Sequence, residues 1–410
     1  MNNRHIPSFM NLPSRDEIIS RILENWELKR DIELIPVEAA IGRIPAKDVF
    51  AQVTIPVVRA SSGDGVAVMS SRFSDGLPDT SDWVLGRDFE RADTGDDFDD
   101  AFDAVIMIEN VDISDDGKLT IHDGVAVAPN SGVRPAGSTV KASDPLAKAN
   151  LPLRPKDLAG MQMGGVTKLA VWKRPVVAFI PSGSELIAPG TPLTRGKNID
   201  TNSILVCETL KQLGAEPLCF PIVKDEYAPL SAALDEALIK ADVVIINGGS
   251  SKGDEDCTAT LLHEKGNVLC HGAQAVPGKP LCAAIIGGKP VVNLPGPFMA
   301  AYHGLEWCIN AIVSHYLMLP RRRRQTVKAT LKKELRGSGE VSILTIVEVE
   351  RKKDGSGYWA TPLSFKDIPT WRSVAANGQY MTKLNEYIAA GGEIEAELLR
   401  DLAYIETAAD

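Results

Sequence analysis

The strongest chemical signal in this 410-residue sequence is a glycine- and serine-rich segment that directly follows a predicted buried strand. The segment reads Gly248-Gly249-Ser250-Ser251-Lys252-Gly253-Asp254-Glu255-Asp256 and comes after the apolar run at 241–247. Glycines let a ligand approach the backbone, and the N–H groups and hydroxyls there suit phosphate or another oxyanion. The carboxylates of Asp254 and Asp256 could hold a divalent cation beside that anion. The alternative is a plain strand-to-helix turn with an acidic helix start.

Three more turns carry related chemistry. Pro277-Gly278-Lys279-Pro280 is a rigid turn that presents one lysine, a point cation suited to phosphate. Ser182-Gly183-Ser184-Glu185 offers hydroxyls and a carboxylate after another predicted strand, and Leu294-Pro295-Gly296-Pro297 is a rigid turn at a strand end. Each is ambiguous alone, because a solvated surface turn has the same composition. The sequence shows no Ser/His/Asp arrangement and no Walker-type or dinucleotide-type glycine motif.

Two short motifs stand apart in the first third of the chain. Ser61-Ser62-Gly63-Asp64-Gly65 places an aspartate between glycines, which is also the usual composition of a turn. Thr94-Gly95 opens an acidic tract, since residues 93–116 hold ten acidic side chains and no basic one. We interpret most of these acids as a solvated loop.

The elements that must position these turns follow from periodicity and from capping residues. Ser14 and Glu17 form a capping pair at the start of a predicted helix over 14–26. From residue 174 the pattern alternates, with strands predicted at 175–181, 216–222, 241–247 and 290–294 and helices at 201–213, 229–240 and 298–318. This alternation predicts a doubly wound, mostly parallel sheet. Ligands bind such sheets outside the carboxyl ends of the strands, which places the chemistry after residues 181, 247 and 294.

The fold class we predict is a multidomain α/β protein. A helical segment comprises residues 14–45 and 141–172, where 158–169 has helical texture, and an inserted β domain comprises 46–140. The central α/β domain covers 173–324 and a small C-terminal β domain covers 325–410. The length is compatible with several domains of ordinary size.

Composition excludes some classes of protein. The net charge is −10 and the pI is near 5.3, so nucleic acid is not an expected partner. No apolar run reaches the roughly 20 residues of a membrane span, and the N-terminus lacks the apolar core of a signal peptide, so we expect a cytoplasmic protein. Six cysteines between 207 and 308 without CxxC spacing predict reduced, mostly buried thiols. The basic run Arg321–Arg324 is either a basic hinge near an anion site or a surface linker.

Taken in order, these motifs resemble those of the molybdopterin molybdenumtransferase family, which includes MoeA and the gephyrin E domain. AAIGRIPAKDV at 39–49, SSGDGVAV at 61–68, TGDDFDDAFDAVIMIEN at 94–110 and PSGSEL at 181–186 each match a family motif, as do NIDTNS, GGSSKGDED, PGKP and LPGPF further on. AANG at 375–378 resembles a segment of the family's last domain. The match extends from about residue 14 to 400.

The resemblance implies a fold and a reaction. The family has a helical segment, an inserted β domain, an α/β domain that binds molybdopterin and a C-terminal β barrel. It forms homodimers in which the β domain of one subunit closes the pocket of the other. The implied reaction uses Mg²⁺, inserts molybdate into adenylylated molybdopterin and releases AMP.

The resemblance also assigns roles to residues of this chain. The implied catalytic residues are Asp64, contributed by the partner subunit, together with Thr94, Glu185, Asp225 and Asp256. Of these, Glu185, Asp225 and Asp256 would bind the metal or substrate. The implied pterin-phosphate pocket comprises Ser182, Gly183, Gly248, Gly249, Ser250, Ser251, Gly253, Pro277, Gly278, Lys279, Pro295 and Gly296.

The sequence departs from the family motifs at several positions. Gly63 and Val66 replace a methionine and a tyrosine, Ser184 replaces an aspartate, and the pair Ser138-Thr139 replaces two acids. Pro297 and Phe298 replace an asparagine and a proline. The alternative hypothesis is therefore a divergent paralogue that binds a pterin, a nucleotide or a partner protein without turnover.

Overall fold

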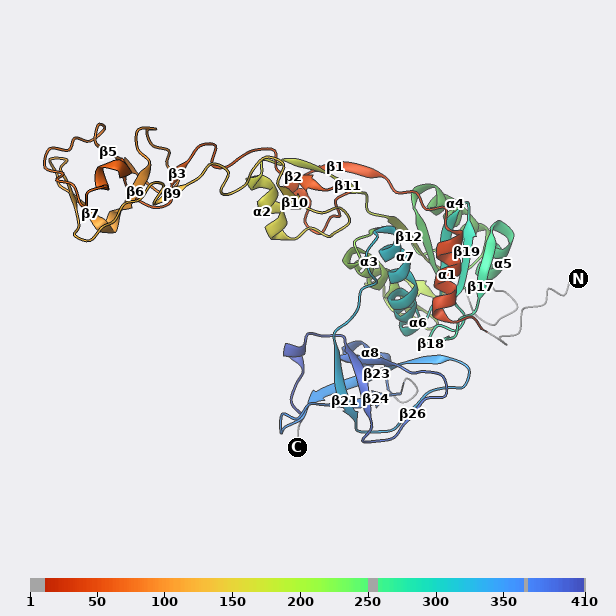
Figure 1. The fold of residues 1–410 in the computed structure, drawn as a ribbon. Helices are drawn as coiled ribbons and strands as arrows, with labels where there is room; N and C mark the ends of the chain where they lie inside the picture. The colour runs from red at the N-terminus through yellow and green to blue at the C-terminus, as the bar shows by residue number, and fades with distance from the viewer. Residues whose placement is uncertain (1–11, 250–256, 365–367, 409–410) are drawn as a thin grey trace, which may run out of the picture. The chain divides into compact units, whose positions relative to one another are not determined.

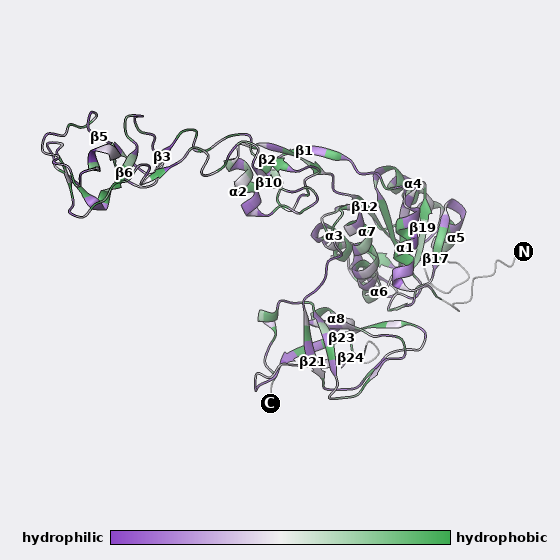
Figure 2. Cartoon of the chain, in the orientation of Figure 1, coloured by the Kyte–Doolittle hydropathy of each residue, from purple (hydrophilic) through white to green (hydrophobic). Residues whose placement is uncertain are grey.

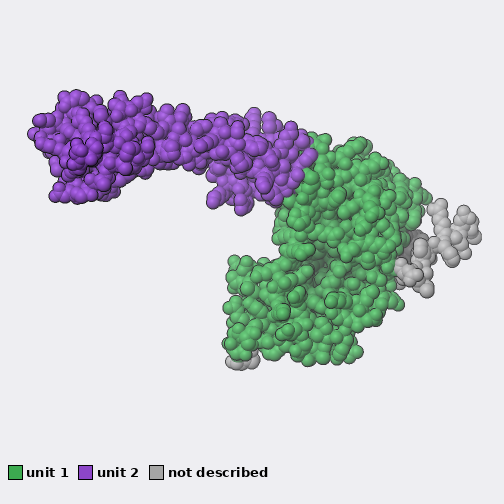
Figure 3. Space-filling view, in the orientation of Figure 1, with its two compact units in different colours: residues 1–31, 173–410 green, residues 32–172 purple. Residues whose placement is uncertain are grey.

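A computed structural model describes residues 12–249, 257–364 and 368–408 (Figure 1). The chain divides into two compact units (Figure 3). The first unit comprises Met1–Asp31 and Lys173–Asp410, and the second comprises Ile32–Trp172. Each unit is described separately below. None of the described helices has the combination of length and apolarity needed to cross a membrane.

The centre of the first unit is a six-stranded sheet. Its strands lie in the order β15 (Glu216–Cys219), β12 (Val176–Pro181), β16 (Val243–Asn247), β20 (Lys289–Leu294), β19 (Cys282–Ile286) and β17 (Asn267–His271). The first four strands are mutually parallel. At one edge of the sheet, β19 pairs antiparallel with β20, and β17 pairs antiparallel with β19. The predicted mostly parallel sheet is therefore confirmed. Two short strands, β13 (Leu186–Ile187) and β14 (Asn198–Ile199), pair outside it.

Helices cover both faces of this sheet because its strands are apolar on both sides (Figure 2). On β12, Ala178 and Ile180 join a buried cluster with leucines of α4 (Tyr227–Lys240) and α5 (Cys257–Lys265). The alternating residues Val177 and Phe179 are fully buried on the opposite face, where α3 (Asn202–Gln212) also contacts β12.

The long helix predicted after β20 contains an irregular turn. It comprises α6 (Phe298–Gly304), a π-helical turn η4 (Leu305–Ile309) and α7 (Asn310–Tyr316). The side chains of Leu305, Cys308 and Ile309 are buried in this turn. The apolar periodicity located the helix but did not reveal the π turn, because one extra residue in a helix that is buried on several sides leaves the pattern almost unchanged.

Helix α1 (Arg15–Asn25) begins as predicted, since Ser14 Oγ accepts a hydrogen bond from the Glu17 N–H at 3.2 Å. Its buried residues Ile18, Ile19 and Ile22 pack toward β17, β19 and α7. This differs from our grouping of residues 14–45 with 141–172, because α1 belongs to the compact unit that contains the α/β sheet. An apolar stripe shows that a helix packs on something but not which sheet it meets.

The second unit is rich in short strands, and its buried apolar residues lie in two separate regions. One core surrounds α2 (Pro155–Met163), β1 (Ile32–Pro36) and β11 (Lys168–Trp172), beside the pair β2 (Val49–Phe50) and β10 (Pro145–Ala147). The other surrounds β4 (Gly65–Val68), flanked by β5 (Phe89–Ala92) and β6 (Ala104–Met107), with β7 (Val111–Ile113) and β8 (Leu119–Ile121). Strands β3 (Ala60–Ser61) and β9 (Val133–Arg134) form a further pair. The helical texture at 158–169 is only partly right, because α2 ends before Gly164-Gly165.

The C-terminal β domain is a closed barrel, as the family resemblance implies. Its strand order is β23 (Ser342–Arg351), β24 (Tyr358–Leu363), β21 (Thr326–Leu331), β27 (Glu393–Leu398) and β25 (Gly378–Met381), and β25 pairs back to β23. Strands β22 (Leu335–Arg336) and β26 (Tyr387–Ile388) form a side ribbon, and α8 (Thr370–Ala375) precedes β25. Strand β18 (Ala275–Val276), from the α/β region, pairs in parallel with the start of β23.

The expectation that all cysteines are reduced is wrong for one pair. Cys207 on α3 and Cys219 on β15 form a disulfide, with their Cα atoms 7.0 Å apart. The two positions are neighbours because α3 and β15 are consecutive and pack together. The other four cysteines form no disulfide, and burial raises the pKa of the Cys270 thiol to about 12.

The position of α1 leads to a stability prediction. Ile22→Ala should destabilise the first unit by about 2–5 kcal/mol, because it removes a fully buried side chain. Amide hydrogen exchange should then rise in β17 and β19 and stay unchanged in Ile32–Trp172. Leu23→Ala, at a partly exposed neighbouring position, is the control and should cost less. Faster exchange confined to α2 and β11 would show that α1 belongs with the second unit.

Candidate functional site

Three of the predicted turns meet at one edge of the parallel sheet. Pro181 lies opposite Asn247, and Asn247 lies opposite Leu294, so the chain leaves β12, β16 and β20 at the same level. The residues that follow these strands are Ser182-Gly183, Gly248-Gly249 and Pro295-Gly296. Ser182 also bridges to Val223, which brings the segment that contains Asp225 to the same edge.

Two buried asparagines, here called the amide clamp, hold the turn that follows β20 in place. Asn247 Nδ2 donates to the carbonyl oxygens of Leu294 and Pro295 at 3.2 and 2.9 Å. Asn202 Nδ2 donates to Asn247 Oδ1 at 2.8 Å and to the Gly296 carbonyl at 2.7 Å. Because a buried carbonyl without a donor is costly, the clamp both satisfies this turn and fixes its position.

Gly248 and Gly249 are required by close approach as well as by backbone conformation. Gly248 has φ +124°, and a Cβ there would lie 2.1 Å from the Ser182 carbonyl oxygen. Gly249 has φ +68°, and a Cβ there would lie 2.2 Å from Thr258 Oγ1 and 3.0 Å from Asp225 Oδ1. The glycines therefore form a cradle of polar atoms that no other residue type would leave open.

Asp225 is the most unusual carboxylate of this cradle. Its Oδ1 atom is shielded from solvent and has no hydrogen-bond partner among the residues that the structure describes. Burial, followed by the nearby negative charge of Glu185, raises the pKa of the Asp225 carboxyl above its usual value. The carboxylate oxygens of Glu185 lie only 2.9 Å from where a Cβ on Gly183 would stand. A cation between Asp225 and Glu185 would relieve both the burial penalty and the repulsion.

The lysine turn reaches the same edge from the antiparallel side of the sheet. Cys282, the first residue of β19, pairs with Asn293 near the end of β20, and Lys279 precedes it by three residues. The carbonyl oxygen of Lys279 accepts from the Ala273 N–H at 2.8 Å, and that of Gly278 accepts from the Leu281 N–H at 3.0 Å. Gly278 has φ +118°, which explains its place in this turn.

Ser250, Ser251, Gly253 and Asp256 lie outside the described residues. The roles given to them above stay predictions. Among the residues that are described, no group of three or more histidine, cysteine or acidic side chains could hold a metal ion.

In the second unit, the structure brings Asp64 and Thr94 together. The N–H and hydroxyl of Thr94 both donate to Asp64 Oδ1, at 2.8 and 2.7 Å. These two hydrogen bonds lower the pKa of the Asp64 carboxyl, which is fully solvated. Thr94 therefore orients an ionised Asp64.

The positions that depart from the family motifs are locally accommodated. The sulfur of Met107 lies 2.7 Å from where a Cβ on Gly63 would stand, so Met107 fills the space of the missing side chain. Val66 is fully buried in the core around β4. Thr139 Oγ1 accepts from Arg134 Nη2 at 2.8 Å, next to Ser138. Ser184 is exposed, and its carbonyl accepts from Lys197 Nζ at 2.7 Å.

Sequence reasoning missed the polar residues that support the site. The amide clamp, the fully buried Thr258 and the buried Asn293 were not identified as candidates. The only signals were a polar residue at the end of an apolar strand, for Asn247, and the capping sequence Asp200-Thr201-Asn202. Asp200 accepts from the backbone N–H groups of Asn202 and Ser203, both at 3.1 Å, which places Asn202 at the first turn of α3.

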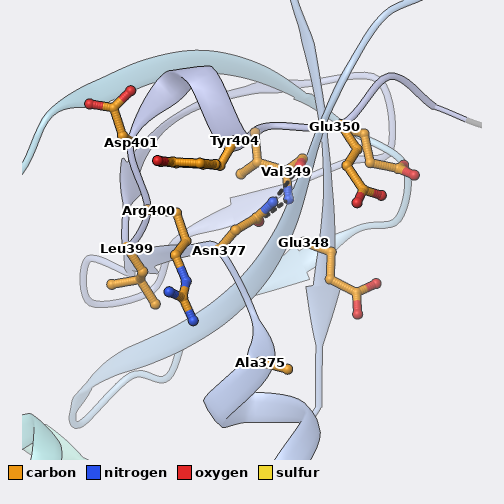
Figure 4. A pocket seen from close by; sticks show the side chains of 10 residues that line it. Glu348, Val349, Glu350, Ala375, Asn377, Leu399, Arg400, Asp401 and Tyr404 are labelled. Carbon is orange, nitrogen blue, oxygen red and sulfur yellow. Dashed lines mark hydrogen bonds between the residues drawn. The ribbon is translucent and has the colours of Figure 1, made fainter.

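A cavity of about 880 Å³ lies on the barrel, away from this edge (Figure 4). Two of its four acidic residues, Glu348 and Glu350, pair with Arg372 and Lys332, respectively. Asn377, from the AANG segment, uses its side-chain amide on the backbone N–H and carbonyl of Val349, each at 2.8 Å. Because these groups already bond within the barrel, we place the candidate site at the sheet edge and not in this cavity.

The basic run before the barrel acts as a linker that makes local contacts. Arg321 pairs with Asp16 at 3.3 Å, and Arg324 pairs with Glu306 at 2.8 Å. Arg322 Nη1 donates to the Gln212 side chain at 3.2 Å. These contacts favour the surface-linker interpretation over a basic hinge at an anion site.

Comparison with known proteins agrees with this arrangement. The family model "MoeA N-terminal region (domain I and II)" matches residues 13–165, and the model "Probable molybdopterin binding domain" matches residues 178–315. The second match covers the sheet whose edge carries the candidate site.

Similar proteins and structures span most of the chain. A molybdopterin molybdenumtransferase of Haemophilus influenzae is 28% identical over 293 residues, which are 68% of this chain and 72% of that protein. A putative molybdopterin biosynthesis protein of Methanocaldococcus jannaschii is 26% identical over 84% of this chain and 89% of its own. A solved structure of the molybdopterin biosynthesis protein MoeA from Pyrococcus horikoshii has the same fold, with a TM-score of 0.78, 24% identity and coverage of 95% of this chain and all of that one. The chain belongs to the MoeA family.

Proposed function

We propose that this protein acts in molybdenum cofactor biosynthesis, as a transferase that inserts molybdate into adenylylated molybdopterin and releases AMP. The observation that supports this most directly is the cradle formed by Ser182, Asp225, Gly248 and Gly249 at the carboxyl edge of the sheet. It places a shielded carboxylate oxygen with no described partner next to backbone able to approach a phosphate. Relatives that carry the name molybdopterin molybdenumtransferase support a transferase role in molybdenum cofactor biosynthesis.

The residues of the proposed site have different roles according to their charge. The Gly248-Gly249 and Pro295-Gly296 turns let a pyrophosphate and an oxyanion approach the backbone, and Lys279 adds a positive charge at the same edge. Asp225 and Glu185 would face the phosphate linkage. Because two carboxylates repel a phosphate, this arrangement would require a cation between them. Asp64, ionised and oriented by Thr94, would supply a further acid from the partner subunit of a homodimer.

The residues present fit a magnesium ion. Mg²⁺ usually binds one or two protein carboxylates together with substrate phosphates, which agrees with Asp225 and Glu185 as the described candidates. Asp256, the third predicted ligand, lies outside the described residues. When bound, the ion would neutralise charge that develops on the phosphate as the AMP linkage breaks. The location in the cytoplasm stays a prediction.

The alternative, a divergent paralogue without turnover, is distinguished by one assay. Purified protein with adenylylated molybdopterin, molybdate and Mg²⁺ should release AMP, and Asp225→Ala should lower this rate by about 100-fold or more, since the variant loses a proposed cation ligand. Asp235→Ala, an exposed acid on α4, is the matched control and should retain the rate. Tight binding of the substrate by wild-type protein without AMP release would establish the paralogue instead.

A shared active site predicts complementation between two inactive variants. Asp64→Ala and Asp225→Ala should each be inactive alone, because each removes one half of every site. In a randomly mixed population of both, about a quarter of the wild-type rate should return, since half of the dimers are mixed and each has one intact site. Mixed dimers purified through two different tags should show about half of the wild-type rate, and mixed dimers without activity would argue that Asp64 and Asp225 of one chain serve the same site.

The contact between Thr94 and Asp64 predicts a measurable change in protonation. In wild-type protein the Asp64 carboxyl should titrate below the usual aspartate range, because Thr94 stabilises the ionised form. Thr94→Val removes the hydroxyl and should raise that pKa, whereas Thr94→Ser should keep it low. Carboxyl ¹³C NMR titration measures the shift, and identical curves for wild type and Thr94→Val would contradict the assignment. The folding stability that this pair contributes should be lost as the pH falls through the lowered pKa.

A further inference from the structure

The buried histidine of α6 lies directly against the lysine turn. His303 is 1% exposed, and its Nδ1 atom lies 2.7 Å from the Pro277 carbonyl oxygen. Burial lowers the pKa of His303 to about 4, so the ring is neutral at pH 7. A carbonyl oxygen only accepts, and therefore Nδ1 carries the proton and donates to it.

The helix that presents His303 has little freedom to move. Gly304, the next residue, packs so tightly on β20 that a Cβ there would lie 2.5 Å from Leu294 Cδ2. The same helix starts directly after the Pro295-Gly296 turn, which the amide clamp holds. His303 thus links two turns of the candidate site. Its helix continues directly from the Pro295-Gly296 turn, and its side chain bonds to the Pro277 carbonyl of the lysine turn.

The lysine turn is also held by its backbone, since Ala275 and Val276 just before it pair with Ser342 and Ile343 of β23. The carbonyl of Lys279 accepts from the Ala273 N–H, and that of Gly278 from the Leu281 N–H. Gly278 is permissive in conformation, and nothing in the described chain lies closer than 3.8 Å to where its Cβ would stand. The bond from His303 joins the start of this turn to α6.

We propose that His303 is a positioning residue, which holds the Pro277-Gly278-Lys279 turn so that the Lys279 side chain is kept in place for an anionic ligand. The role of Lys279 toward phosphate rests on the proposed function, whereas the effect of His303 on the turn does not. His303 acts through the Pro277 carbonyl and touches no reacting atom.

The first test uses amide hydrogen exchange on the full chain without ligand. His303→Leu removes the donor, and we expect the Ala273 and Leu281 amides to exchange at least about fivefold faster, the factor expected for one lost hydrogen bond. His303→Asn retains a donor near the Nδ1 position and should keep both amides near wild type. His315→Leu makes the same change on α7, away from the turn, and is the control. Unchanged exchange in His303→Leu, measured beside an unchanged melting temperature, would overturn the proposal.

The second test separates positioning from general packing. With AMP as the probe, His303→Leu should weaken binding about fivefold and His303→Asn should restore it. In a Lys279→Met background, His303→Leu should cause no further loss, because His303 acts through Lys279. An equal loss in both backgrounds would show a merely structural role and overturn the ligand part of the proposal. If wild-type protein binds no AMP, the proposed function fails, and the exchange experiment still decides whether His303 holds the turn.

Discussion

Backbone carbonyls at the carboxyl edge of a parallel sheet must find donors, and in this protein the amide clamp supplies them. Asn247 ends a strand that is buried on both sides, so its side chain has no water to bond. The side-chain amide of Asn247 donates instead to the carbonyls of Leu294 and Pro295 at the end of β20. Asn202, in the first turn of α3, donates to the side-chain oxygen of Asn247. Three connections that are far apart in sequence are thereby joined. The Pro295-Gly296 turn, and the start of α6 that follows it, are therefore tied to the end of β16 and to the first turn of α3.

The sequence predicted the central sheet well because its strands are continuous apolar runs that end in glycine or proline. The predicted elements agree with β12, β16, β20, α1 and α3 to within a few residues. The candidate turns could be found for the same reason, since they directly follow those runs. The hydrogen bond between Asp64 and Thr94 was harder to predict, because the two residues are thirty positions apart in the sequence. Only the family resemblance suggested that both residues matter.

Other features could not be predicted because no local pattern encodes them. The π turn η4 leaves the apolar periodicity of the long helix almost intact, and the Cys207–Cys219 bond depends on how α3 packs beside β15. His303 looks like one more residue of an apolar helix, and only the fold reveals that it faces the Pro277 carbonyl. The sequence also did not show which sheet α1 covers, because the apolar stripe of a helix does not specify the surface on which it packs.

The strand β18 has a mechanical consequence. It belongs to the same loop as the lysine turn, only three residues before Lys279, yet its ladder partner is β23 of the barrel. Tyr302 on α6 also donates to Gln379 of the barrel at 2.9 Å. The barrel is therefore attached to the α/β region by these two contacts as well as by the linker at 319–325. Any rotation of the barrel would strain the peptide that presents Lys279, so the position of this domain and the proposed anion site are coupled through residues 275–279.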